Sequence, residues 1–194
     1  MDERIFGDRE KAMEDAYFRD QNAKLLDKLR QRADLDEIAQ ALGEKLQVDN
    51  PDLLAKVRAL GITLETAPAF FLAPLVQVAW AEGKVSQEER DVILRVAQDR
   101  GIAAGSPALA VLNEWLQVRP LGDFFDTAVQ VLKAGFEVLP EPERDERAAT
   151  VLQACREVAQ ASAGLGRLLG LGDGVSNAEA AVIEEISGKL KGPR

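Results

Sequence analysis

The pattern of apolar and polar positions is helical along most of the chain. Apolar residues recur at spacings of three and four, which is typical of one buried helix face, and Pro and Gly punctuate these periods. No alternating run of useful length predicts a strand. The sequence therefore predicts an all-α fold, a bundle of about seven to nine helices.

Breaks in the pattern set the expected helix boundaries. Asn50-Pro51 and Ser106-Pro107 each combine an N-cap residue with a proline at the first helical position. The apolar stretch from Thr66 to Glu82 is predicted to be one central core helix, kinked at Pro74. Further helices are expected over Ser86 to Arg100, Ser106 to Leu116, Asp123 to Leu139, Pro142 to Ser162 and Asn177 to Leu190.

The chain divides into three parts. Residues 1–34 are densely charged and form a predicted N-terminal helical arm, residues 35–63 connect through short helices, and residues 64–194 form the main helical domain. From Asp8 to Ala33 there is no Gly or Pro, which predicts one helix of roughly 26 residues and about 40 Å. Its apolar stripe is thin, so the arm either packs on its own domain or projects toward a partner.

One pattern occurs twice, in residues 82–93 and again in residues 173–183. Val, Ser, Glu, Val and Ile recur at an offset of 90 residues. In the first copy Ser86 and Glu89 have the spacing of a capping box, and in the second copy Ser176 and Glu179 have it. The duplication predicts two pseudo-symmetric halves, each containing one of these helix starts.

Acidic residues lie near both predicted helix starts, and the sequence is compatible with two interpretations of these residues. Capping explains the Ser and Glu positions without any ligand, because it pairs amides that a helix start leaves free. Alternatively, carboxylates pooled from both copies bind a divalent cation, Ca²⁺ or Mg²⁺, through oxygen ligands. The second interpretation requires the two starts to converge in space. The candidate metal ligands are Glu82, Glu88, Glu89, Asp173 and Glu179.

Composition narrows the classes of function. The net charge of −9 over 194 residues argues against binding nucleic acid and favours cations or basic protein partners. The chain has no His, which removes the most frequent general base and zinc ligand. No nucleophile stands beside a base, so we expect no catalytic residues, no organic cofactor and a non-enzymatic protein.

The single cysteine and the apolar runs indicate the cellular compartment in which the protein is expected. Cys155 lies on an apolar helical stripe, which predicts a core position rather than a reactive thiol. A lone cysteine forms no disulfide framework, so a reducing cytoplasm is expected. No secretory apolar segment opens the chain, and the longest apolar run, Ala67 to Ala81, is too short to span a bilayer.

The duplicated motifs carry a family resemblance that covers about residues 64 to 191. The residues Ala81-Glu82-Gly83-Lys84-Val85-Ser86-Gln87-Glu88-Glu89 are similar to the pattern A-D-G-x-v-s-x-x-E of the TerB-like family, known from tellurite-resistance operons. The stretch Leu169-Gly170-Leu171-Gly172-Asp173-Gly174-Val175-Ser176-Asn177-Ala178-Glu179 resembles it as well. The resemblance implies a helical bundle with two similar halves, metal binding through acidic residues, and assembly with membrane-associated stress complexes. Glu82 stands where the family usually has Asp.

The arm resembles a different family. Phe6-Gly7-Asp8-Arg9-Glu10-Lys11-Ala12-Met13-Glu14-Asp15-Ala16-Tyr17, with Asp20, looks like the start of bacterial ATPase-inhibitor zeta subunits, which read F-x-D-R-E-K-A-x-E-x-x-F. In that family the N-terminal helix blocks rotation of the F1 motor.

Two functions are therefore expected from the sequence. The first is a non-enzymatic TerB-like module in a stress response, which binds a divalent cation, protein partners, or both. Its partner contacts would lie in residues 1–34 or on the acidic surface. The alternative is a regulator of an ATPase that acts through its inhibitor-like N-terminal helix.

Overall fold

The structure is a computed structural model, and it describes residues 39–191 except 41, 45, 48, 138 and 162–173. Within these residues every regular element is a helix and none is a strand, which confirms the all-α prediction. The predicted arm, residues 1–34, lies outside the described residues, as does most of the glycine-rich stretch before Gly174.

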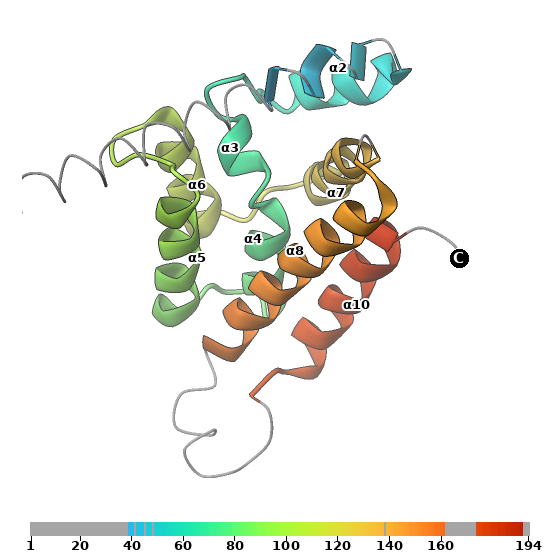
Figure 1. Cartoon of the computed structure of the whole chain (residues 1–194). Coiled ribbons are helices and arrows are strands. Elements are labelled where there is room, and N and C mark those ends of the chain that lie inside the picture. The colour runs from blue at the N-terminus through green and yellow to red at the C-terminus, as the bar shows by residue number, and fades with distance from the viewer. Residues whose placement is uncertain are drawn as a thin grey trace, which may run out of the picture.

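The helices form a bundle around α4 (Figure 1). In chain order their bounds are α2 (Pro51–Ala59), α3 (Ala67–Phe70), α4 (Ala73–Ala79), α5 (Gln87–Asp99), α6 (Pro107–Gln117), α7 (Phe124–Phe136), α8 (Glu141–Ala161) and α10 (Asn177–Lys191). Helix α4 packs against α5, α7, α8 and α10. Its side chains Leu75, Val76 and Val78 are fully buried, because apolar residues cover most of its faces.

The stretch from Thr66 to Glu82 corrects one prediction. It forms two short helices, α3 and α4, rather than one kinked helix. Pro74 has no N–H to donate to the carbonyl of Phe70, and its ring would clash with that carbonyl in a continuous helix. The first helix accordingly ends at Phe70, and the next begins at Ala73.

The other boundaries follow the predicted caps closely. The side chain of Asn50 accepts a hydrogen bond of 3.1 Å from the backbone N–H of Leu53, with Pro51 in the first helical turn. Ser106 caps α6 in the same way, through a bond of 3.2 Å from the N–H of Leu109. Helix α5 ends at Asp99, and Gly101 follows with a left-handed φ of 80°.

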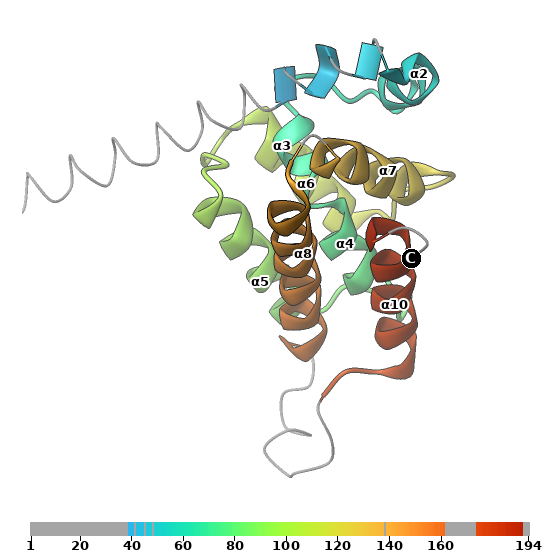
Figure 2. The same ribbon diagram turned by 45° about the vertical axis from the view of Figure 1, so that its right-hand side comes forward.

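Helix α8 contacts α4, α5 and α10. Each of α5 and α10 begins with one copy of the duplicated pattern, so both of these helices pack against α8. Figures 1 and 2 show α5 and α10 beside α8, with both helix starts toward the same end of the bundle. Cys155 lies on the buried side of α8 with no exposed surface, which confirms its predicted core position.

An aromatic cluster joins α3, α6 and α7. Phe70 of α3, Trp115 of α6 and Phe124 of α7 make edge-to-face contacts with ring centroids 4.8–6.5 Å apart. The indole N–H of Trp80 donates a hydrogen bond of 2.8 Å to the backbone carbonyl of Trp115. None of the helices in the described ranges is both long and apolar enough to cross a membrane.

Candidate functional site

The start of α5 is a complete capping box. Ser86 is the N-cap, and its hydroxyl oxygen accepts a hydrogen bond of 3.2 Å from the backbone N–H of Glu89. In return, Oε2 of Glu89 accepts bonds from the backbone N–H of Ser86 at 2.7 Å and from its hydroxyl at 2.6 Å. Gly83 precedes the box with a φ of 82°, a left-handed conformation that glycine adopts readily.

The start of α10 repeats this arrangement. Oε2 of Glu179 accepts a bond of 2.7 Å from the backbone N–H of Ser176, and the Ser176 hydroxyl accepts one of 3.2 Å from the N–H of Glu179. Gly174 has a φ of 81°, matching Gly83. The other oxygen of Glu179, Oε1, is buried and has no hydrogen-bond partner among the described residues.

Both capping glutamates are buried, which the sequence analysis did not predict. Glu89 exposes 4% of its surface and Glu179 exposes 1%. The signal was present in the spacing. Glu89 lies one and two turns before the buried Ile93 and Ala97, and Glu179 lies one turn before Ile183. Each glutamate therefore continues the apolar stripe of its own helix into the core.

The two buried carboxylates interact electrostatically. The pKa of Glu89 is raised above its usual value chiefly because burial removes water from the carboxylate. Hydrogen bonds from Ser86 lower this pKa, while repulsion from the carboxylates of Glu179 and Glu82 raises it. The duplicated helix starts thus bring Glu82 and Glu179 close enough to repel the carboxylate of Glu89.

The predicted metal ligands differ in their surroundings. Glu82 and Glu88 are exposed, Glu89 and Glu179 are buried, and Asp173 lies outside the described residues. Within the part of the chain that the structure describes, no three Asp, Glu or Cys side chains are grouped closely enough to hold a metal ion. Of the described candidate ligands, Glu89 and Glu179 are thus the two that are buried.

Nucleophilic chemistry has no support from Cys155. Burial raises the pKa of its thiol to about 12, although Arg100 and Arg156 act in the opposite direction. A thiol with this pKa is almost entirely protonated at neutral pH, and the protonated form is a poor nucleophile.

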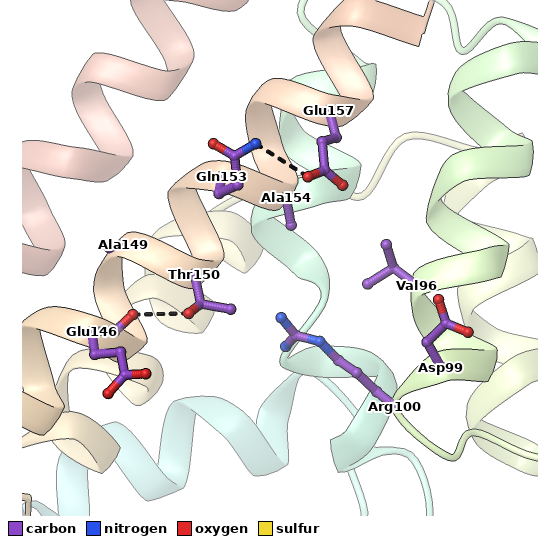
Figure 3. Close-up of a pocket in the computed structure, with 9 residues that line it drawn as sticks. All are labelled: Val96, Asp99, Arg100, Glu146, Ala149, Thr150, Gln153, Ala154 and Glu157. Carbon is purple, nitrogen blue, oxygen red and sulfur yellow. Dashed lines mark hydrogen bonds between the residues drawn. The ribbon is translucent and has the colours of Figure 1, made fainter.

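A second feature that the sequence analysis missed is a groove between α5 and α8. Its volume is about 480 Å³, and Arg100 extends into it from the end of α5 (Figure 3). The sequence predicted that the helix from Ser86 ends at Arg100, directly before Gly101. No periodicity in either helix showed that α8 would face this guanidinium.

Comparisons of the chain with family models, with curated proteins and with solved structures give no match. The two family resemblances therefore rest on the short motifs that carry them.

Proposed function

We propose that the chain is a non-enzymatic, TerB-like module in which the duplicated helix starts bind a divalent cation. The observation that carries this proposal is Oε1 of Glu179, which is buried without a hydrogen-bond partner among the described residues. A buried acceptor left unpaired destabilises a fold by roughly 1–3 kcal/mol, and more when it is charged. A cation at this oxygen would remove that penalty.

The neighbouring carboxylate supports the same proposal. Glu89 and Glu179 repel each other in a desolvated place, and a cation between them would turn this repulsion into attraction. Mg²⁺ is usually bound through one or two carboxylates and retains several waters, whereas Ca²⁺ takes six to eight oxygen ligands. A pair of buried carboxylates suits Mg²⁺ better, and Ca²⁺ would need further oxygens from Glu82, Glu88 or Asp173.

Cation titration of the whole protein tests the proposal. Mg²⁺, Ca²⁺ and Mn²⁺ are added in turn, with heat measured by calorimetry and the melting temperature by circular dichroism. For a Kd of 1 mM, 10 mM cation stabilises the folded state by about 1.4 kcal/mol. This gain corresponds to a melting temperature higher by roughly 3–6 °C for a chain of this size.

Two variants make the test specific. Glu179→Gln removes one charge at the site and should abolish the cation-dependent rise, whereas Glu184→Gln, on the exposed side of α10, should retain it. If the parent protein gives neither heat nor a higher melting temperature at 10 mM cation, the two carboxylates only cap their helices.

Partner binding belongs to the same proposal. The net charge of −9 favours a basic protein surface as the partner, in keeping with a role in a stress-response assembly. Regulation of an ATPase by residues 1–34 stays a prediction, because that segment lies outside the described residues. A peptide of residues 1–34 that leaves the hydrolysis rate of an F1 motor unchanged would end that alternative.

A further inference from the structure

The groove between α5 and α8 contains the guanidinium of Arg100. Arg100 follows the last residue of α5, and its side chain points into the space between the two helices (Figure 3). Among the described residues, its guanidinium forms no hydrogen bond or ion pair. A guanidinium carries five N–H donors in a planar fork, so this one offers its donors to a ligand.

The surroundings of Arg100 disfavour its positive charge. Its pKa is lowered chiefly because burial desolvates the guanidinium, and the nearby positive charge of Arg147 lowers it further. The Cys155 thiolate would oppose both effects, but that thiol is protonated at neutral pH, because its own pKa is about 12. A partly desolvated cation without an acceptor is unfavourable, and a bidentate carboxylate is the acceptor that fits the planar fork best.

Three carboxylates also line the groove. Asp99 lies on the α5 side, and Glu146 and Glu157 lie on α8 (Figure 3). Oε1 of Glu157 accepts a hydrogen bond of 3.1 Å from the side-chain amide of Gln153 and keeps other acceptor sites open. These negative charges disfavour a multiply charged anion such as phosphate, and they offer acceptors to an ammonium group.

Apolar surface completes the lining. The apolar lining residues are Val96 of α5 and Ala149 and Ala154 of α8. Small apolar side chains leave room for an aliphatic part of a ligand and favour its burial, at about 25 cal/mol for each Å² of apolar area removed from water. The volume of about 480 Å³ is in the range of small-molecule sites.

We propose that this groove binds a small aliphatic amino acid as its zwitterion. The carboxylate of the ligand pairs with the fork of Arg100, its ammonium group faces Glu157, and its side chain lies against Val96 and the two alanines. This site shares no residue with the capping boxes, so the proposal does not depend on the proposed cation site.

Three probes of matched shape test the ligand chemistry on the full chain. They are L-valine, 3-methylbutanoate, which lacks the ammonium group, and 2-methylpropylamine, which lacks the carboxylate. Inorganic phosphate serves as a fourth probe. Binding is measured by calorimetry and by shifts of backbone amide signals in nuclear magnetic resonance spectra. We expect saturable binding of valine, binding at least tenfold weaker for the two truncated probes, and none for phosphate.

Variants identify the residue that recognises the carboxylate. Arg100→Gln should weaken valine binding at least tenfold, and Arg100→Lys should restore only part of it, because an ammonium lacks the bidentate fork. Arg95→Gln, an exposed position on the same helix, is the matched control and should bind as the parent does. Glu157→Gln should weaken valine but not 3-methylbutanoate, which separates the two charged contacts without altering Arg100.

The proposal is overturned by any of three results. Valine gives no saturable signal at tens of millimolar, or phosphate binds as well as valine does, or Arg100→Gln binds valine as tightly as Arg95→Gln does. Circular dichroism spectra of the variants accompany the titrations, so a loss of binding counts only for a variant that is folded.

Discussion

Replacing Glu89 separates its two physical roles. It caps α5 through bonds to Ser86, and it holds a buried charge near Glu179. Glu89→Gln keeps a side-chain oxygen for the box, since Gln also serves at this position, but it removes the charge. Glu89→Ala removes both.

The direction of the pH dependence follows from the raised pKa. A carboxyl group whose pKa is higher in the folded state than in the unfolded state binds its proton more tightly when folded. Its stabilising contribution is fully present below the ordinary pKa of 4.5 and is lost as the pH rises through the folded value. Because of Glu89, the free energy of unfolding of the parent protein should therefore decrease as the pH rises above 4.5. The variant Glu89→Gln should not show this decrease.

The magnitudes separate the two variants at pH 7. Glu89→Ala leaves the backbone N–H of Ser86 without its partner and shortens the side chain inside the core. Losing such a cap and leaving a half-buried donor unpaired together destabilise by roughly 2–3 kcal/mol. The melting temperature should fall by roughly 5–10 °C. Glu89→Gln should be at least as stable as the parent, because its amide needs no charge in a desolvated place.

Urea unfolding followed by circular dichroism from pH 4 to pH 8, with EDTA to remove divalent cations, measures these free energies. Glu88→Gln is the control, since Glu88 is exposed in the same helical turn. If Glu89→Gln is as destabilised as Glu89→Ala and keeps the pH dependence of the parent, the buried charge is not what sets the stability of this helix start.

Three further predictions concern the scaffold. An added Cβ meets no neighbour at Gly83 or at Gly188, so the backbone conformation decides the effect of alanine at each position. Gly83→Ala should destabilise the protein by about 1 kcal/mol in thermal melts, because the φ of this residue is 82°. Gly188→Ala inside α10 should stabilise it by about 0.5–1 kcal/mol. Ile93→Ala should cost about 2–5 kcal/mol in urea unfolding, because this fully buried side chain leaves a cavity in the core. Cys155 should react with a maleimide only as fast as the protein unfolds, and labelling of the native protein within minutes at pH 8 would contradict its burial.

Local signals in the sequence predicted most of the helix boundaries. The caps at Asn50, Ser86 and Ser106 predicted where α2, α5 and α6 begin, because a cap acts through bonds within one turn. Pro74 was also recognised, but its effect was predicted as a kink. Whether a proline bends or breaks a helix depends on the packing of both pieces, which the pattern of one segment does not contain.

The candidate sites depended more on tertiary contacts. The capping role of Glu89 and Glu179 was predicted from spacing, whereas their burial depends on the packing of α5 and α10 against α4 and α8. The guanidinium of Arg100 is a candidate because α8, which begins more than 40 residues later in the chain, faces it (Figure 3). Contacts of this kind require knowledge of which helices are neighbours.

The bond between Trp80 and Trp115 has a practical consequence for spectroscopy. The chain contains two tryptophans, and this bond places both at the meeting of α4 and α6. Intrinsic fluorescence therefore reports on one corner of the molecule. A change in emission on heating would therefore report on the surroundings of this hydrogen bond before it reports on the rest of the bundle.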